Sequence, residues 1–401
     1  MKISINANRC EPSPMRKFHP LAVAAEKQGK HIYHLNIGQP DLPTPKEYYE
    51  AITGFRNETL AYAASPGMPV LIEAIREYYA EIGVALDPGD ILVTTGGSEA
   101  ILLTCLSILD PYTEVIIPEP YYPNYTTFVH AAGGVIRALP TEPSEGYRYA
   151  FRDRLESLIT KNTRAIMVTN PGNPTGVVLD KEEMRMIADV AKKHDLFLIS
   201  DEVYREFCYD DRFGIPTMGC FDDIDENLVI IDSVSKRFSA CGARIGCVVT
   251  KNKELQAALL KFCQSRLSVA TIDQIGAAAL YSVDHGFYIT SKAEYRARRD
   301  TVVAGLKNIP GVLVEEPMGA FYVMACLPVD DSDKFQKWLL EEFDDNGDTV
   351  MFAPGAPFYE TPGKGINEVR IAYVLEQEKL ERAIDLLSKG IARYRKEVMG
   401  L

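Results

Sequence analysis

Short runs rich in valine and isoleucine alternate with amphipathic stretches through the middle of the chain, from about residue 91 to residue 250. Apolar runs of about four to eight residues are typical of buried strands, and longer amphipathic stretches are typical of helices. Because two parallel strands need a crossover between them, usually a helix, this alternation predicts an α/β domain with a largely parallel sheet. We expect its strands at residues 91–95, 114–118, 135–139, 165–169, 196–200, 228–232 and 244–250.

The pattern changes near residue 291, where a long charged helix is expected over residues 291–307. Apolar runs at residues 321–326, 350–353 and 369–374 and a final helix at about residues 376–398 follow it. The start of the chain is rich in proline, which favours an arm over an independent unit. We therefore predict a large α/β domain over residues 46–290, and a smaller α+β domain that residues 291–401 form together with an N-terminal arm, residues 1–45.

Charge and cysteine usage exclude several classes of protein. The 401-residue chain has a formal net charge of −13 and no basic block that could follow a phosphate backbone, so no nucleic-acid partner is expected. No apolar stretch reaches the roughly 18 residues that a membrane helix needs, and the first residues lack the pattern of a secretory signal. We expect a cytoplasmic protein without a membrane partner. The eight cysteines are scattered without the spacing of a zinc site, so no metal is expected.

Lys236 lies in a serine-rich turn directly after the apolar run at residues 228–232. Most lysines are solvated surface residues, but the ligands of parallel sheets bind where the strands end. A lysine placed among groups that hold an aldehyde cofactor can form a Schiff base with it. A site for pyridoxal phosphate needs such an amine, an acid for the ring nitrogen and donors for the phosphate.

Residues near Lys236 could supply these other groups. Ser233, Ser235 and Arg244 could donate to a phosphate, although Arg244 could equally form a surface ion pair. Asp201 follows the strand expected at residues 196–200, where it could cap a helix or keep a ring nitrogen protonated.

Other predicted strand ends carry polar or aromatic residues. Gly97 and Ser98 lie between a strand and a helix, where backbone amides can bind an anion, although glycines are also common turn residues there. Asn173 lies in a loop rich in proline and glycine and could donate to a phenolate oxygen. Tyr121 or Tyr122 could stack on a planar ring or belong to the core.

Arg370 interrupts an otherwise apolar run in the last third of the chain. A buried guanidinium needs an anionic partner, which could be a substrate carboxylate bound by two hydrogen bonds or an internal carboxylate.

Together these motifs occur in the order found in fold-type I pyridoxal-phosphate enzymes, and the chain resembles the class I/II aminotransferases over nearly its whole length. Among them it is most similar to bacterial proteins called aspartate aminotransferases. The motifs that carry the resemblance are residues 36–41, Tyr62 with Gly67, residues 95–100, 170–176, 201–204 and 233–236, and Arg370. The resemblance implies the fold-type I architecture, an α/β fold with a large domain built on a mainly parallel mixed sheet flanked by helices, plus a smaller α+β domain. It also implies a homodimer whose active sites are shared between the subunits.

The resemblance further implies a role for each matching residue. Lys236 would form the Schiff base with pyridoxal phosphate and act as base and acid, Asp201 would pair with the ring nitrogen, and Asn173 and Tyr204 would contact the ring hydroxyl. Tyr122 would stack on the ring. Arg370 would hold the substrate α-carboxylate with help from Gly38, and Asn173 would also lie against the substrate. The residues expected at the phosphate are Gly97, Ser98, Ser233, Arg244 and, from the neighbouring subunit, Tyr62.

The implied reaction is transfer of an amino group from an L-amino acid, aspartate first, to a 2-oxo acid such as 2-oxoglutarate. The chain departs from the family pattern at two positions, one next to the phosphate arginine and one that bears on the substrate. Ala243 stands where relatives often have tryptophan, and Ser98 stands where some aspartate-specific relatives have lysine. We hypothesise that Arg266 replaces that lysine and binds a distal carboxylate.

Other functions remain open at this point. They are an aminotransferase for aromatic or other amino acids, a C–S lyase or decarboxylase of the same fold, a non-catalytic regulator that binds the cofactor, and a nicotinamide-dependent oxidoreductase. A substrate bound by its α-carboxylate at Arg370 disfavours decarboxylation, and the segment before residue 36 is too short for a DNA-binding module.

Overall fold

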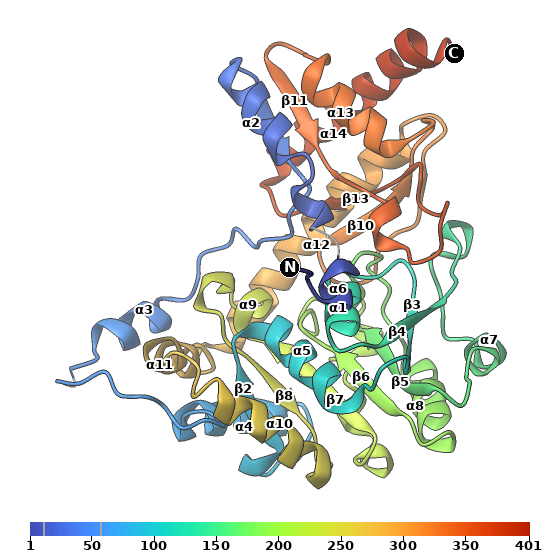
Figure 1. The fold of residues 1–401 in the computed structure, drawn as a ribbon. Helices are drawn as coiled ribbons and strands as arrows, with labels where there is room; N and C mark the ends of the chain where they lie inside the picture. Colours follow the sequence, from blue (N-terminus) through green and yellow to red (C-terminus); the bar gives the residue numbers. More distant parts are fainter. Residues whose placement is uncertain (11–12, 57) are drawn as a thin grey trace.

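The computed structural model describes residues 1–10, 13–56 and 58–401. Its larger sheet has seven strands in the order β2-β8-β7-β6-β5-β3-β4 (Figure 1). β8 runs antiparallel to both of its neighbours, and the other pairings are parallel. The bounds are β2 Ile91–Thr94, β3 Glu114–Pro118, β4 Val135–Leu139, β5 Thr163–Thr169, β6 Phe197–Asp201, β7 Leu228–Ser233 and β8 Gly246–Val249.

Helices cover both faces of this sheet, which is why its strands are apolar on both sides. One face packs against α3, α4, α7, α8 and α11, and the other against α5, α6 and α10. The bounds are α3 Lys46–Thr53, α4 Pro69–Glu81, α5 Gly96–Ile108, α6 Asn124–Ala131, α7 Arg152–Ser157, α8 Lys181–Lys193, α10 Lys253–Ser265 and α11 Thr271–Leu280. Asp180 caps α8 by accepting a hydrogen bond of 2.7 Å from the Glu183 amide.

The predicted α/β fold with a mainly parallel mixed sheet is confirmed, and each expected strand of this region is present. One expected boundary is wrong. The strand predicted at residues 244–250 begins at Gly246, because Arg244 has a φ of 53° and lies in the left-handed region, which a strand cannot accommodate.

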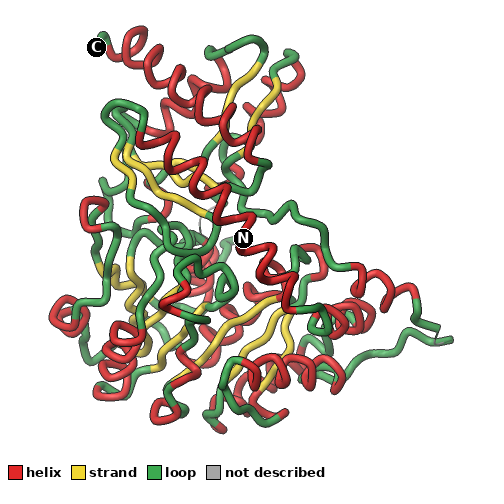
Figure 2. The backbone as a smooth tube through the Cα atoms, turned by 180° about the vertical axis from the view of Figure 1, so that it is seen from behind, coloured by secondary structure: helices red, strands yellow, loops and turns green. Residues whose placement is uncertain are grey.

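A second group of elements, built largely from the last third of the chain, has its own hydrophobic core. It contains a four-stranded sheet in the order β12-β13-β10-β9 and a two-stranded parallel sheet of β1 and β11. Figure 2 shows these strands apart from the larger sheet. The bounds are β1 His31–His34, β9 Leu313–Val314, β10 Tyr322–Cys326, β11 Asp348–Met351, β12 Ala353–Pro354, β13 Glu368–Ala372, α2 His19–Lys27, α12 His285–Lys307, α13 Ser332–Glu341 and α14 Gln377–Tyr394.

Helix α12 begins earlier than the residue 291 expected from the sequence, because Asp284 caps it by accepting a hydrogen bond of 2.7 Å from the Gly286 amide. The expected domain boundary at residue 290 therefore lies inside this helix. The division into two domains stays a prediction.

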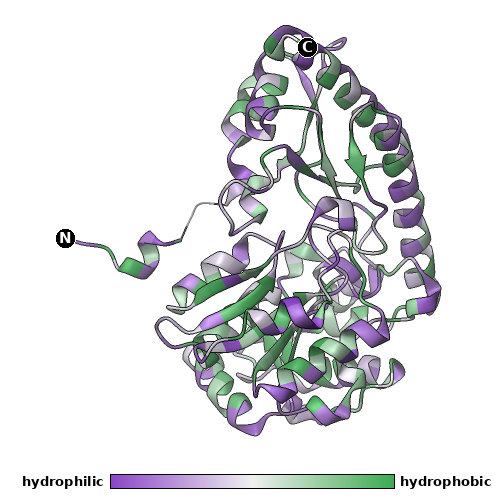
Figure 3. Cartoon of the chain, turned by 90° about the vertical axis from the view of Figure 1, so that its right-hand side faces the viewer, coloured by the Kyte–Doolittle hydropathy of each residue, from purple (hydrophilic) through white to green (hydrophobic). Residues whose placement is uncertain are grey.

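The N-terminal segment contributes to two places. α1 (Ile5–Asn8) lies at one side of the molecule (Figure 3), where the Asn6 side-chain amide donates a hydrogen bond of 3.4 Å to the Ala131 carbonyl oxygen of α6 and Arg9 donates one of 3.1 Å to the Gly134 carbonyl oxygen. Farther along, buried residues of α2 and β1 form a small separate cluster with Leu340 of α13 and Met351 of β11, and β1 pairs with β11. Among the described helices, none is long and apolar enough to cross a membrane.

Candidate active site

The predicted site residues come from strands that are neighbours in the sheet. β5, β6 and β7 lie side by side and parallel, so their carboxyl ends meet at one edge. Asp201 ends β6, Ser233 ends β7, and Asn173 lies in the loop after β5. The fold therefore brings together residues that are far apart in the sequence, at the edge where ligands of such sheets bind.

Lys236 lies in the short helix α9 (Val234–Arg237) and is half-buried. Its Nζ donates a hydrogen bond of 2.7 Å to the carbonyl oxygen of Gly38, which comes from the N-terminal part of the chain. The Cys241 Sγ lies 3.7 Å from the same nitrogen. A side chain at Gly38 would overlap the hydroxyl of Tyr322, so only glycine lets the chain pass this close to the lysine.

Asp201 is 5% exposed and accepts two hydrogen bonds. The Tyr125 hydroxyl lies 2.5 Å from its Oδ2, and the Val203 amide lies 3.3 Å from its Oδ1. Burial raises the pKa of Asp201 to about 6. The carboxylate therefore caps the following turn and is also a buried acid without a cationic partner among the described residues, and its pairing with a ring nitrogen stays a prediction.

Tyr125 was not among the predicted site residues. Its hydroxyl also lies 2.7 Å from the Thr169 Oγ1, so it links the ends of β5 and β6. It lies on α6, in the same tyrosine-rich segment as Tyr121 and Tyr122 at residues 120–125, and this segment is the signal in the sequence that could have found it.

Arg370, on β13, is 2% exposed and contacts no carboxylate in the part of the chain that the structure describes. It donates to the Asn36 carbonyl oxygen at 2.6 Å and to the Asn173 Oδ1 at 3.1 Å. Its guanidinium lies 4.4 Å from the centre of the Tyr322 ring. Neutral oxygens and aromatic rings therefore surround this buried cation, and the internal salt bridge considered from the sequence is not found.

Tyr322 connects Arg370 with Tyr204 and Lys236. Its hydroxyl lies 2.8 Å from that of Tyr204 and 3.5 Å from the Gly38 carbonyl oxygen, which also accepts from Lys236. Tyr322 was not predicted. The amine, the guanidinium and two phenols thus form one continuous group.

The expected phosphate donors also gather in one place. The first turn of α5 carries Gly97 and Ser98, and the Arg244 Nη2 lies 3.4 Å from the carbonyl oxygen of Thr95, the residue that precedes the helix. The hydroxyls of Ser233 and Ser235 are 2.7 Å apart. Helix amides, two hydroxyls and an exposed guanidinium are the donors that a phosphate dianion requires, so these residues fit the group.

Two predicted site residues, Tyr122 and Tyr62, are not part of the group formed around Lys236 in the single chain. Tyr122 is half-buried, and its hydroxyl accepts a hydrogen bond of 2.7 Å from the Asn124 amide; burial raises its pKa to about 12. Tyr62 is 82% exposed, in the extended segment between α3 and α4, and does not join the site of its own chain.

Arg266, expected to bind a distal carboxylate, forms an ion pair with Glu99. It also donates to the Val93 carbonyl oxygen at 2.7 Å and to the Ser65 carbonyl oxygen at 3.3 Å. Glu99 in turn accepts a hydrogen bond of 2.6 Å from the Thr95 amide. In this chain Arg266 therefore supports the turn that carries Gly97 and Ser98.

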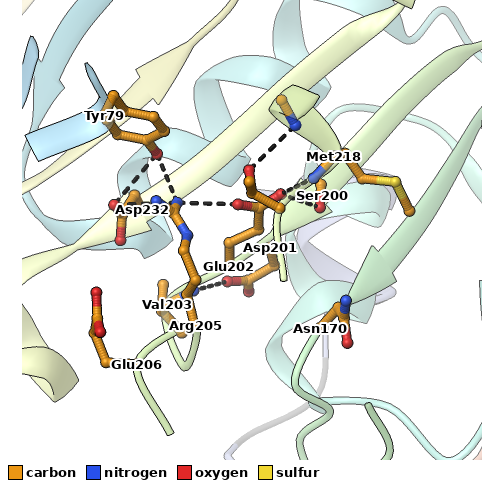
Figure 4. Close-up of polar contacts among 12 residues, drawn as sticks. Tyr79, Asn170, Ser200, Asp201, Glu202, Val203, Arg205, Glu206, Met218 and Asp232 are labelled. Carbon is orange, nitrogen blue, oxygen red and sulfur yellow. Dashed lines mark hydrogen bonds and ion pairs between the residues drawn. The ribbon is translucent and has the colours of Figure 1, made fainter. Parts of the chain in front are cut away.

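Behind Asp201 lies a group of buried charged residues that sequence reasoning missed (Figure 4). Arg205 is at its centre, with its Nη2 2.7 Å from the Tyr79 hydroxyl, 3.0 Å from the Glu202 Oε2 and 3.3 Å from the Asp232 Oδ2. The sequence does contain a signal, since each of these charged residues interrupts an apolar or motif segment.

The chain as a whole is similar to aminotransferases. Residues 30–387 match the family described as aminotransferase class I and II. The aspartate aminotransferase of Pyrococcus horikoshii is 34% identical over 366 residues, which cover 90% of this chain and 90% of that protein. A solved structure of a Thermus thermophilus aspartate aminotransferase single mutant matches with a TM-score of 0.88 at 30% identity, over 97% of this chain and all (100%) of the other. The alanine aminotransferase from Pyrococcus furiosus matches with a TM-score of 0.89 at 28% identity, over 98% of this chain and 100% of that one.

These matches cover both parts of the fold and confirm the family suggested by the sequence motifs. They leave transamination as the reaction class and set aside the lyase, regulator and oxidoreductase alternatives. This chain belongs to the class I and II aminotransferase family and is a pyridoxal-phosphate-dependent transaminase.

Proposed function

We propose that this transaminase moves the amino group of L-aspartate to a 2-oxo acid such as 2-oxoglutarate, with Lys236, Asp201 and Arg370 as the central residues of its site. The observation that carries the proposal is the continuity between Lys236 and Arg370. The Gly38 carbonyl oxygen lies 2.7 Å from the Lys236 Nζ and 3.5 Å from the Tyr322 hydroxyl, and the Arg370 guanidinium lies over the Tyr322 ring. An amino acid held by its carboxylate at Arg370 would present its Cα to the amine.

Pyridoxal phosphate, when bound, supplies a ring that withdraws electrons from the carbon next to the substrate nitrogen. We place its phosphate at Gly97, Ser98, Ser233, Ser235 and Arg244, whose amides, hydroxyls and guanidinium fit a dianion. Its aldehyde would be held by Lys236 and its ring hydroxyl by Asn173 and Tyr204. Tyr122 would cover the ring.

The protein groups then have distinct tasks. The Lys236 Nζ would take the proton from the substrate Cα as a general base and deliver it again as a general acid. The Asp201 carboxylate would keep the ring nitrogen protonated. The protonated nitrogen would in turn give this buried carboxylate a cationic partner, in addition to the neutral donors Tyr125 and Val203. Arg370 would exchange its neutral partners for the substrate carboxylate, which forms stronger hydrogen bonds because it is charged.

The test of this assignment is the variant Lys236→Ala. We expect transamination to fall by at least about 1000-fold, because general acid-base catalysis and the covalent anchor are both lost. Steady-state turnover and mass spectrometry after borohydride treatment, which fixes the cofactor to a lysine, are the measurements. A folded Lys236→Ala protein with substantial turnover, or a cofactor fixed to another lysine, would contradict the assignment.

Aspartate is the proposed donor because relatives along nearly the whole chain carry that name. A second candidate is a neutral amino acid, alanine or an aromatic one. The engagement of Arg266 by Glu99 favours it, since the guanidinium would have to leave that partner to bind a distal carboxylate.

The variant Arg266→Ala distinguishes aspartate from a neutral amino acid as the preferred amino donor. If Arg266 binds a distal carboxylate, kcat/KM for aspartate falls at least about tenfold more than kcat/KM for alanine or tyrosine, because only aspartate loses a charged hydrogen bond. Equal losses for all donors would exclude this role and fit support of the turn. The half-reaction, followed by the visible absorbance of the bound cofactor with each amino acid in turn, gives the donor preference directly.

A further inference from the structure

A group of buried charged residues lies directly behind the proposed site. Its four central members are each 2% exposed or less, and each is next in sequence to a site residue. Glu202 follows Asp201, Arg205 follows Tyr204, Asp232 precedes Ser233 and Arg237 follows Lys236. Consecutive side chains on a strand point to opposite faces, so Asp232 of β7 faces away from the side that carries Ser233, and Glu202 directly follows the last residue of β6. We call Glu202, Arg205, Asp232 and Arg237 the rear network.

Asp232 is the shared partner of the two arginines. Its two carboxylate oxygens accept hydrogen bonds of 3.0 Å and 2.9 Å from the Arg237 Nη2, and its Oδ2 lies 3.3 Å from the Arg205 Nη2. Burial disfavours a charge on Asp232, but the two guanidiniums outweigh it, and the pKa of Asp232 lies below its usual value. The Asp232 Oδ1 also accepts a hydrogen bond of 2.7 Å from the Ser233 amide, which ties the network to the first residue of the Lys236 turn.

Arg205 extends the network to the end of β6. Its Nη2 lies 3.0 Å from the Glu202 Oε2, and the Glu202 Oε1 accepts from the Ser200 hydroxyl at 2.8 Å and from the Met218 amide at 2.9 Å. Figure 4 shows Arg205 reaching from this strand end toward Asp232. The same residues therefore join the turn that carries Asp201 and Tyr204 to the turn that carries Lys236.

Net stability does not account for this arrangement. Two buried guanidiniums lose their hydration, and the Nε and Nη1 atoms of both Arg205 and Arg237 have no hydrogen-bond partner among the described residues. Apolar residues of similar volume often replace such buried ion pairs without loss of stability. Meanwhile α9 spans only Val234–Arg237, a single turn that cannot hold its own conformation. The Lys236 turn thus needs anchors outside itself, and Arg237 is one of them.

We propose that Arg237 and Arg205, joined through Asp232, are positioning residues that fix Lys236 relative to Asp201. The proposal rests on the function assigned above to those two residues. A general base must stay within hydrogen-bond reach of the proton that it moves, and a displacement of about 1 Å can cost about 100-fold in rate. The rear network has no contact with substrate or cofactor in this role and acts through the backbone of the two turns.

The test compares Arg237→Gln with the charge-balanced double variant Asp232→Asn/Arg237→Gln. The single variant removes one of the two cations from Asp232, so we expect a lower Tm, a kcat about 10- to 100-fold lower at saturating cofactor, and a nearly unchanged KM for the amino donor. The double variant removes both charges of that pair, so its Tm should return toward that of the wild type while kcat stays low. If kcat recovers together with Tm, the network only stabilises the fold and the proposal fails.

Two further measurements keep the test independent of folding defects. Titration of the cofactor-free protein gives the dissociation constant of pyridoxal phosphate. We expect this constant to rise in Arg237→Gln and in the double variant, because Ser233 moves with the Lys236 turn. The milder variant Arg237→Lys keeps the charge but loses the planar fork, and we expect a folded protein with a kcat between those of the wild type and Arg237→Gln. Unchanged cofactor affinity and kcat in a folded Arg237→Lys protein would overturn the proposal.

Arg299→Gln is the matched control. Arg299 is also buried, 4% exposed, and pairs with Asp300 at 2.7 Å and Glu316 at 3.2 Å, but it lies on α12, away from both turns. We expect this variant to lose stability without a change in cofactor affinity or kcat. An equal loss of kcat in Arg299→Gln would mean that any unpaired buried arginine has this effect, which would also overturn the proposal. Absence of transamination in the wild-type protein would instead refute the proposed function itself.

Discussion

At the scale of single residues, the charge on Asp201 that the proposed function needs lowers the stability of the cofactor-free protein. The carboxyl is buried against Tyr125, and burial raises its pKa from 3.8 to about 6. A folded pKa above the unfolded value means that the contribution of Asp201 to stability is complete below pH 3.8 and is lost as the pH rises through about 6. Above that range the cofactor-free protein contains a buried charge whose proposed partner is the ring nitrogen.

We therefore predict that Asp201→Asn stabilises the cofactor-free protein at pH 8. Asparagine fills the same volume and cannot ionise, so the free energy of unfolding should exceed that of the wild type by about 1–3 kcal/mol at pH 8 and by little at pH 4. Thermal unfolding of both proteins across this pH range is the measurement. Transamination by the loaded variant should fall at least about 100-fold, because the ring nitrogen loses its charged partner.

The exposed Asp195 offers a control for this prediction. Asp195→Asn should shift the unfolding free energy by the same small amount at both pH values. A stability difference for Asp201→Asn that does not grow with pH would show that the carboxyl is not held at a raised pKa.

At the scale of elements, the close approach of β8 to the first turn of α5 shapes the proposed phosphate site. β8 begins at Gly246, where a side-chain Cβ would lie 2.6 Å from the Gly96 carbonyl carbon and 2.7 Å from the Gly97 amide nitrogen. These are backbone atoms of the turn expected to hold the phosphate. Any larger residue at position 246 must move that turn or the strand.

We predict that Gly246→Ala raises the dissociation constant of pyridoxal phosphate by about tenfold or more, which corresponds to about 1.4 kcal/mol. Overpacking at such a site also costs about 1–3 kcal/mol of stability. Titration of the cofactor-free protein measures the first effect and thermal unfolding the second.

Gly242→Ala is the control in the same region, because a Cβ at Gly242 meets no atom within 4 Å. Its cofactor affinity should match that of the wild type. Similar affinities for Gly246→Ala and Gly242→Ala would mean that the turn does not bind the phosphate or can move without effect.

At the scale of the whole molecule, the segment that carries Tyr62 is exposed in the single chain. Tyr62 is 82% exposed and Leu60 is 59% exposed, both in the segment between α3 and α4. We propose a homodimer in which Tyr62 of one subunit reaches the phosphate held by the other. Each site would then combine Lys236 of one chain with Tyr62 of its partner.

We predict that mixed dimers distinguish a shared site from a closed one. Tyr62→Phe should weaken cofactor binding about 5- to 50-fold through loss of one hydrogen bond to a charged phosphate. In a dimer of one Lys236→Ala and one Tyr62→Phe subunit, one site keeps both wild-type residues. At limiting cofactor, activity of the mixed dimers should therefore exceed that of either parent, and sedimentation verifies the dimer. If the activity of the mixed dimers does not exceed that of the parents, each active site is formed by a single chain.

The strands of the large sheet and the polar residues at their ends could be predicted from the amino-acid pattern alone. Valine-rich and isoleucine-rich runs form strands wherever both faces are covered, and the parallel crossover rule then brings Asp201, Ser233 and the loop with Asn173 to one edge. The local sequence pattern was sufficient to predict where these residues lie, because each of them is at or just after the end of its own strand. The late start of β8 was missed because the left-handed backbone of Arg244 has no signature in the amino-acid type.

Which side chains contact one another could be learned only from the folded chain. Tyr125 reaches Asp201, Arg266 pairs with Glu99 on a different helix, and Arg205 shares Asp232 with Arg237. Each pair lies on separate elements, so its distance depends on how those elements pack and on which way each side chain points. Hydrophobic periodicity predicts which face of an element is buried, but it does not predict which charged atoms lie next to each other there. For this reason the residues at the strand ends could be predicted from the sequence, whereas the contacts of Tyr125, Arg266 and the rear network could not.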